Sequence, residues 1–199
     1  MESFRIIGIM LIKDEDLYIE RVIQNVINFC DELIIAENYS QDRTYKIVSD
    51  LARQYRKISL HRIKDLQTSH QLIENFVGSK TWIFRVDGDE IFDPSGLEVL
   101  RRKLYDGAFQ DQWGVYGNML HCTHLDPSRN IAKGYLAPPA RTGMTLFNFS
   151  IIKSWVNCFQ RLHSGTITFK EGYHHDLRYH LEYELSWEES YLRCLHTVF

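Results

Sequence analysis

The sequence lacks several features that would assign a class at once. It has four cysteines in 199 residues and no apolar run long enough to span a bilayer. The cysteines are scattered without the paired spacing of a disulfide framework, which favours reduced thiols and a cytoplasmic location. The segment 4–12 has neither the basic start nor the small-residue cleavage site of a signal peptide, so we do not expect secretion.

The sequence also lacks a large net charge of either sign. The net charge of -3 offers no general attraction for nucleic acid or anionic lipid, so any phosphate binding must be local. A composition of 44% apolar and 25% charged residues is ordinary for one soluble domain. A zinc site could be built from His121, Cys122 and His124 with Cys194 and His196. Their wide, unpaired spacing instead favours half-buried strand residues.

Apolar runs and helical patterns alternate along the first half of the chain. The runs at 4–12, 33–36, 58–61 and 82–86 read as buried strands. Helical spacing of apolar residues separates them, from Ile19 onward, at 45–55 and at 72–77. This order predicts an α/β fold, a mostly parallel, doubly wound sheet with helices on both faces. Ligands of such sheets bind beyond the carboxyl ends of the strands.

Polar residues follow each expected strand, so we expect them to gather along one edge. The most acidic group is Asp87-Gly88-Asp89-Glu90, which ends the run beginning at Trp82. Carboxylates at this density suit a divalent cation that carries a phosphorylated substrate. A solvated acidic turn is the simpler alternative, but the strand before it is apolar. We expect Glu90 to hold the turn.

The alternation ends after residue 94. Ser95 and Glu98 resemble a capping box that opens a helix ending near Tyr105. A long mobile loop that could act as a lid is expected at 123–143, where Lys133 and Arg141 could close over a diphosphate. The other expected elements are strands at 113–122, 145–152 and 166–169, and a helix in the last part of 179–196.

Three turns carry a resemblance to a known family. They are Lys13-Asp14-Glu15-Asp16, Glu37 to Thr44, and Asp87-Gly88-Asp89. Their order and intervals across residues 4–94 resemble the family-2 glycosyltransferases of the GT-A fold. The resemblance implies one GT-A catalytic domain over 1–199, with a smaller acceptor-side sheet. Residues 1–94 would bind the nucleotide-sugar and 95–199 the acceptor. The apolar end at Phe199 has no C-cap, which prompts the hypothesis that this is the N-terminal part of a longer protein.

The resemblance also implies roles for the donor-binding residues. Lys13, Glu37 and Asp65 would lie in the nucleotide-sugar site, with Glu37 and Asp65 near the nucleotide. Asp87 would face the ribose or the metal. Gly88 would let the backbone approach the sugar diphosphate.

The metal would be Mn²⁺ or Mg²⁺, and Asp89 would coordinate it. A late histidine supplies another ligand in many members of the fold. Tyr173-His174-His175-Asp176 resembles that segment, and neighbouring strand residues point to opposite faces, so we expect one histidine to bind, with His174 favoured.

The resemblance implies a metal-dependent inverting glycosyltransferase of the hexosyltransferase type, active in glycan or polysaccharide synthesis. Its partners would be a nucleotide-diphosphate sugar and a hydroxyl acceptor. Inversion requires a base, and the candidates are His163, Glu171 and Asp176. Ser164 stands where one related subgroup has a glutamate, which leaves an inactive sugar-nucleotide or glycan-binding module as an alternative. A sugar nucleotidyltransferase is less favoured, because 11–15 contains no glycine.

Overall fold

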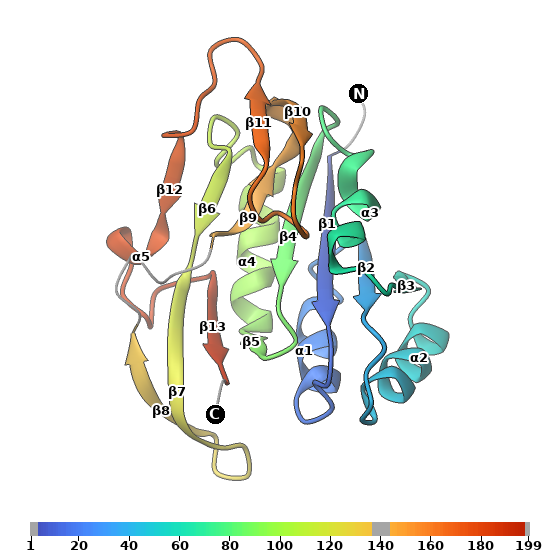
Figure 1. The fold of residues 1–199 in the computed structure, drawn as a ribbon. Coiled ribbons are helices and arrows are strands. Elements are labelled where there is room, and N and C mark those ends of the chain that lie inside the picture. The colour runs from blue at the N-terminus through green and yellow to red at the C-terminus, as the bar shows by residue number, and fades with distance from the viewer. Residues whose placement is uncertain (1–3, 137–143, 198–199) are drawn as a thin grey trace.

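A computed structural model of the protein describes residues 4–136 and 144–197, and its centre is a seven-stranded sheet (Figure 1). The strand order is β12-β6-β9-β4-β1-β2-β3. All neighbours pair in parallel except β9, which runs antiparallel to β4 and β6. This arrangement confirms the mostly parallel α/β sheet predicted from the sequence. The strands are β1 (Arg5–Ile12), β2 (Glu32–Glu37), β3 (Ile58–Arg62), β4 (Thr81–Val86), β6 (Gly114–Tyr116), β9 (Met144–Asn148) and β12 (Arg178–His180).

Apolar cores form on both faces of the sheet, which explains the continuous apolar runs. In β1, Ile6 and Met10 join one core while Ile7 and Ile9 join the other. The first core lies under α1 (Ile19–Val26), α2 (Thr44–Gln54) and α4 (Pro94–Tyr105). The second lies under α3 (Gln71–Glu74), which follows η1 (Leu66–Ser69), and under the hairpin of β10 (Ile152–Val156) and β11 (Thr166–Phe169).

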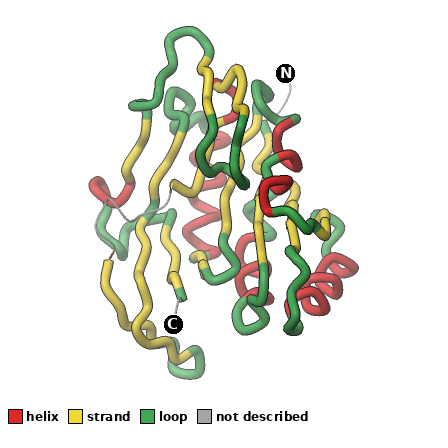
Figure 2. Tube along the Cα trace, viewed as in Figure 1, coloured by secondary structure: helices red, strands yellow, loops and turns green. Residues whose placement is uncertain are grey.

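A smaller four-stranded sheet extends the molecule beside the main one. Its order is β5-β13-β7-β8, with β13 parallel to β7 and antiparallel to β5. Figure 2 shows helices gathered around the parallel strands, and mostly strands and loops on the other side. These strands are β5 (Glu90–Phe92), β7 (Asn118–Asp126), β8 (Ile131–Leu136) and β13 (Arg193–His196), and the remaining elements are η3 (Phe149–Ile151) and α5 (Leu181–Glu184). No helix among the described residues is long and apolar enough to cross a membrane.

The second half departs from the expected elements. The expected strand at 113–122 is two strands in different sheets, which turn at Gly117, where an added Cβ would lie 2.4 Å from the Leu192 carbonyl oxygen. The expected loop at 123–143 is wrong as far as Leu136, because these residues complete the β7–β8 hairpin and Lys133 lies exposed on β8. Arg141 lies outside the described residues.

Two expected helix signals also failed. Asp93, not Ser95, is the N-cap of α4: its Oδ1 accepts the Ser95 N–H at 3.0 Å, and Pro94 takes the first helical position. The expected helix near the end of 179–196 is wrong, because α5 is one turn long and residues 193–196 form β13. Pairing with both β5 and β7 satisfies the backbone of this segment as a strand.

Candidate active site

The turns after β1, β2 and β3 are bound to one another at the carboxyl edge of the sheet. The Asn38 N–H donates to the Ile12 carbonyl at 2.9 Å, and the Ile63 N–H donates to the Glu37 carbonyl at 2.9 Å. The Glu15 N–H donates to Thr44 Oγ1 at 2.7 Å. The polar residues that follow these strands therefore meet, as the alternating pattern predicted.

Glu37 holds the turn after β2 from inside. Its side chain is fully buried, and its two oxygens accept hydrogen bonds from the Ser40 N–H at 2.5 Å and from Arg62 Nε at 2.8 Å. The Arg62 guanidinium lies 4.2 Å from the Tyr39 ring centroid and 4.1 Å from that of Tyr45. A planar cation between two rings is thus the surface that this turn presents. Tyr39 adopts a φ of 50°, in the left-handed region that favours glycine.

The other expected donor-site residues lie around the same edge. Lys13 is exposed directly after β1, and Asp65 is exposed after β3, where its carboxylate accepts the Gln67 N–H at 2.9 Å. Gly88 is buried against Glu15, because an added Cβ would lie 2.9 Å from Glu15 Cγ. Gly88 therefore permits close approach of the turn after β1.

The carboxylates after β4 have distinct surroundings. Burial opposes ionisation of Asp87, but the guanidiniums of Arg161 and Arg85 outweigh it and hold the Asp87 pKa below its usual value. Burial raises the pKa of Asp89; nearby Asp87 adds to this effect and His196 opposes it. Burial and Asp87 raise the pKa of Glu90 to about 7, and Glu90 Oε2 accepts the Asp87 N–H at 3.0 Å. Glu90 therefore holds the turn, as expected.

Arg161 forms an ion pair with Asp87, a contact that sequence reasoning missed. It comes from the tip of the β10–β11 hairpin, is 4% exposed, and donates from Nη2 to Asp87 Oδ1. The tip is anchored by hydrogen bonds from the Arg161 N–H to Ser69 Oγ at 2.9 Å and from the Leu162 N–H to His70 Nδ1 at 3.3 Å. The sequence does indicate that Asp87 needs a cation nearby, because an unpaired carboxylate directly after a buried strand is costly, but it does not indicate which cation.

His196, at the end of β13, is the second residue that sequence reasoning missed as a partner of the carboxylates. Its Nε2 lies 3.5 Å from Asp89 Oδ2. The N–H and the hydroxyl of Thr197 donate to the Asp89 carbonyl at 2.9 and 3.0 Å. The C-terminal strand thus fixes the loop that carries Asp89. His196 Nδ1 also lies 2.9 Å from His121 Nδ1. Two of the five residues named as a possible zinc site in the sequence are therefore in contact.

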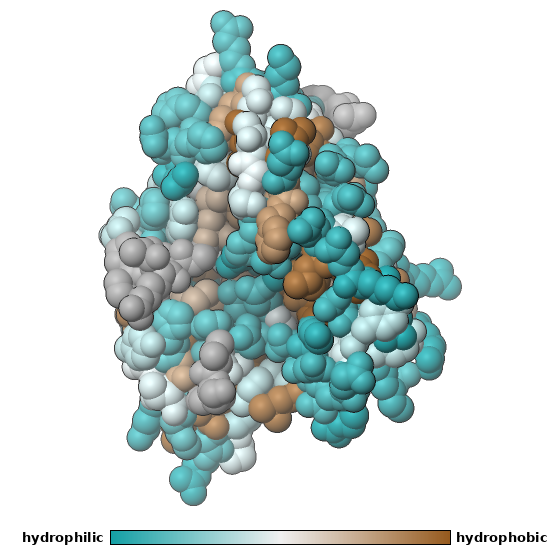
Figure 3. All heavy atoms as spheres, in the orientation of Figure 1, coloured by the Kyte–Doolittle hydropathy of each residue, from teal (hydrophilic) through white to brown (hydrophobic). Residues whose placement is uncertain are grey.

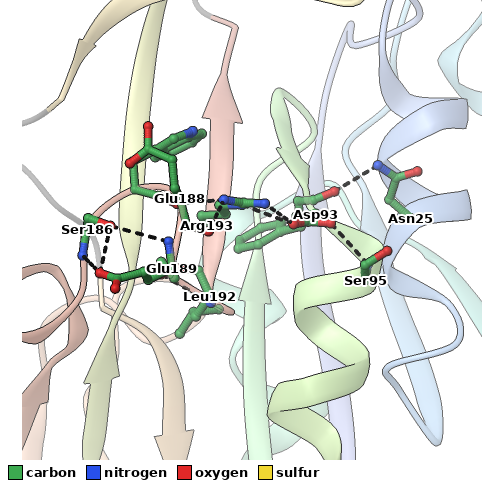
Figure 4. Close-up of polar contacts among 11 residues, drawn as sticks. Asn25, Asp93, Ser95, Ser186, Glu188, Glu189, Leu192 and Arg193 are labelled. Carbon is green, nitrogen blue, oxygen red and sulfur yellow. Dashed lines mark hydrogen bonds and ion pairs between the residues drawn. The ribbon is translucent and has the colours of Figure 1, made fainter.

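An ion pair at the start of α4 holds β13 in place (Figure 4). Arg193 donates from Nε and Nη2 to Asp93 Oδ2 at 3.0 and 2.7 Å. Its Nη1 donates to the carbonyls of Trp187 and Glu188 at 2.6 and 3.0 Å. Because Asp93 also caps α4, one carboxylate joins the helix start to the strand that ends at His196.

The structure does not bring Glu171, His174 or Asp176 to the carboxyl edge. They lie in the turn before β12, which runs in the same direction as β4, so this turn is at the amino ends of the strands (Figure 1). Lys170 Nζ accordingly donates to the Gly78 carbonyl, just before β4, at 3.1 Å. β4 has six residues, and a strand of that length spans roughly 20 Å, so about the length of this strand separates the turn from the carboxylates. His174 Nδ1 instead lies 3.7 Å from Asp176 Oδ2, and both side chains are exposed.

His163 does lie beside the carboxylates, at the tip of the β10–β11 hairpin. Burial, then the charges of Arg85 and Arg161, lower the pKa of His163, while Asp87 opposes them. Of the three candidate bases, His163 is the one at the carboxyl edge.

The side chains at this edge include the ligand types that a divalent cation binds. Asp87, Asp89 and Glu15 offer carboxylate oxygens and His196 offers a ring nitrogen, which are ligand types that Mn²⁺ and Mg²⁺ accept. Burial, with the charges of Asp89 and Asp87, raises the pKa of Glu15 to about 7. No three such side chains among the described residues are arranged to hold a metal by themselves. That agrees with the usual Mg²⁺ pattern of one or two carboxylates plus substrate phosphates.

The comparisons with known proteins agree with this arrangement. Residues 9–155 match the model of glycosyl transferase family 2. The chain belongs to this family, and with its mostly parallel sheet it has the GT-A fold. A search of curated proteins gave no match.

Several solved structures are similar at low identity. TarS residues 1–349 from S. aureus shares 12% identity over 65% of this chain and 39% of that one, with a TM-score of 0.43. Mannosyltransferase PcManGT from Pyrobaculum calidifontis, in complex with GDP-Man and Mn²⁺, shares 15% over 72% and 44%, with a TM-score of 0.44. The 4-diphosphocytidyl-2C-methyl-D-erythritol synthase from Anaerococcus prevotii shares 11% over 74% and 71%, with a TM-score of 0.46. The chain thus spans less than half of the TarS chain and of the PcManGT chain.

Proposed function

We propose that the protein is a metal-dependent, inverting glycosyltransferase that moves a hexose from a nucleotide-diphosphate sugar to an acceptor hydroxyl in glycan or polysaccharide synthesis. The observation that carries the proposal is the position of Asp89. In a chain of glycosyl transferase family 2, it follows a central parallel strand at the carboxyl edge, beside Asp87 and His196. That edge is where open α/β sheets bind their ligands.

Asp89 and Asp87 would hold the divalent ion together with the donor diphosphate, and His196, 3.5 Å from Asp89 Oδ2, would help to position Asp89. A bound Mn²⁺ or Mg²⁺ supplies Lewis-acid stabilisation of the negative charge that develops on the leaving nucleoside diphosphate. Arg161 keeps Asp87 ionised, and Thr197 holds the Asp89 backbone in place. Lys13 and the Tyr39–Arg62–Tyr45 stack would bind the nucleotide part of the donor.

His163 would accept the proton of the acceptor hydroxyl. A base must be neutral before it acts, and the lowered pKa of His163 keeps its imidazole neutral at pH 7. The positive charges of Arg85 and Arg161 that lower this pKa would also favour an anionic leaving group nearby.

The test measures release of free nucleoside diphosphate from UDP-, GDP- and dTDP-sugars with Mn²⁺, in the wild type and in Asp89→Asn. We expect turnover with at least one donor, its loss in EDTA, and a fall of about 100-fold or more in Asp89→Asn, since loss of even an outer partner of a metal ligand costs about 10–100-fold. Asp111→Asn, at an exposed aspartate beyond α4, is the matched control.

The outcomes separate the two functional classes. Equal turnover in Asp89→Asn and wild type would contradict the metal assignment. Tight donor binding without turnover for any donor would favour the inactive binding module that Ser164 suggested. Ser164 itself is engaged in structure, since its carbonyl accepts Trp155 Nε1–H at 3.0 Å.

A further inference from the structure

A cavity of about 280 Å³ lies beside the carboxylates, between the β10–β11 hairpin and the face of β4, β9 and β6. Arg85, on β4 two residues before Asp87, lines it together with His163 from the hairpin tip. Its far side is formed by Arg178, at the start of β12, and His175. Hydrophobic side chains reach the surface near the lower end of this hairpin (Figure 3).

The lining is positive and lacks acids. Two arginines and two histidines line the cavity, and no carboxylate is among the described residues that do. Arg85 is 13% exposed, and its nearest acids, Asp87 and Glu90, each lie 3.9 Å from Nη2, beyond hydrogen-bonding distance. Its buried Nε has no hydrogen-bond partner among the described residues. A buried donor without a partner is costly, and an anionic group in the cavity would satisfy it.

Two buried tryptophans form part of the cavity wall. Trp113 and Trp155 line it, and both indole N–H groups are already used, by the His175 carbonyl at 2.6 Å and the Ser164 carbonyl at 3.0 Å. The two side chains are only 5% and 4% exposed, and the Arg178 guanidinium lies 5.2 Å from the centroid of the Trp113 ring. The indoles therefore form a buried apolar wall of the cavity and position Arg178, while the polar contacts to a ligand come from the arginines. The volume falls just below the range of about 300–1,000 Å³ typical of drug-sized ligands, so it suits one monosaccharide unit.

We propose that this cavity binds an acidic sugar unit, one that bears a carboxylate or a phosphate, and that Arg85 and Arg178 bind its charge while Trp113 and Trp155 form the apolar wall beside it. The proposal rests on the proposed transferase function, because it names the substrate class of the same site. The unit belongs either to the acceptor or to the transferred sugar, since both must approach Asp87 and His163.

The direct test is a tryptophan-fluorescence titration, because two of the four tryptophans line the cavity. The probes are methyl β-D-glucuronide, glucose 6-phosphate and the neutral methyl β-D-glucoside. We expect both anionic probes to bind at least about tenfold tighter than the glucoside, and Arg178→Gln to remove about tenfold of their affinity. Arg102→Gln, at an exposed arginine of α4, should bind like the wild type.

Arg85→Gln is the second variant, with its melting temperature measured alongside because Arg85 is buried. Equal affinity for the glucoside and the glucuronide, absence of saturable binding by any probe, or unchanged affinities in both arginine variants would each overturn the proposal. A turnover preference for UDP-glucuronate over UDP-glucose would assign the acidic unit to the donor, and transfer onto methyl β-D-glucuronide would assign it to the acceptor.

The titration requires neither donor nor metal, so it can fail or succeed separately from the Asp89→Asn experiment. Acidic-sugar binding without turnover would leave the cavity assigned and overturn the transfer reaction. Turnover without preference for acidic probes would do the reverse.

Discussion

Replacing Arg193 by alanine should weaken the protein and its carboxyl edge together. The substitution removes two charge-assisted hydrogen bonds to Asp93 Oδ2 and two to the Trp187 and Glu188 carbonyls. Hydrogen bonds to charged groups contribute about 1.5–3 kcal/mol. Arg193 and Asp93 remain 26% and 24% exposed, so solvent screening favours the lower part of that range. We expect a loss of about 2 kcal/mol in the free energy of unfolding.

For a domain of this size, about 1 kcal/mol shifts the melting temperature by roughly 2–4 °C, so Arg193→Ala should melt roughly 4–8 °C lower. Thermal unfolding followed by circular dichroism measures this shift. Arg193→Lys keeps the charge but loses the forked geometry and should fall between wild type and Arg193→Ala. Lys46→Ala, which breaks an exposed pair with Asp50, is the matched control and should cost less than about 0.5 kcal/mol.

A second readout follows from the position of β13. Loosening Arg193 should free His196 and Thr197 from the Asp89 loop, so nucleoside diphosphate release should fall in Arg193→Ala at a temperature where it is still folded. Melting of Arg193→Ala at the temperature of Lys46→Ala would refute the reasoning that one ion pair holds this strand.

The remaining predictions concern two glycines and one histidine. Gly96→Ala should lower the free energy of unfolding by about 1–3 kcal/mol, because the added Cβ would lie 2.9 Å from the Tyr191 carbonyl oxygen. Gly88→Ala should lower it less, because its Cβ would meet the Glu15 side chain, which can move. Equal melting temperatures of the two variants would contradict this prediction. Burial, opposed by Glu74, lowers the pKa of His70 in the folded protein below the unfolded value of 6.5, so its contribution to stability is present above pH 6.5 and is lost as the pH falls through the folded pKa. His70→Gln should therefore lose less melting temperature than the wild type between pH 7.5 and pH 5.5, and an unchanged difference would argue against it.

The first half of the fold could be predicted because each segment carries its own signal. β1 and β4 are buried on both faces and consist of apolar runs, and α1 shows apolar residues at helical spacing. The second half could not be predicted in the same way. Residues 193–196, Arg-Cys-Leu-His, have no distinctive pattern of apolar residues, and they form a strand because β5 and β7 pair with their backbone on both sides. The chain needs glycine at position 117, between the two sheets, because the backbone of Leu192, 75 positions away, leaves no room for a side chain there.

The candidate site divides along the same line. Asp87, Gly88 and Asp89 follow a strand in the sequence, so their common edge with Lys13 and Glu37 follows from parallel topology alone. The partners that set their charge come from far along the chain: Arg161 is 74 positions from Asp87, and Thr197 is 108 positions from Asp89. Local spacing favoured His174 as the late ligand, whereas strand direction puts it at the opposite end of the sheet from Asp89.

The residues alone therefore specify which edge of the sheet carries the acidic candidate site, because periodicity and turn chemistry are local properties of the chain. The tertiary structure decides that Arg161 contacts Asp87 and that His196 contacts Asp89. These contacts, and the side chains that enclose the cavity, depend on how a hairpin and a terminal strand pack against β4 and β5. Those contacts join positions far apart in the chain, and local patterns carry no record of them.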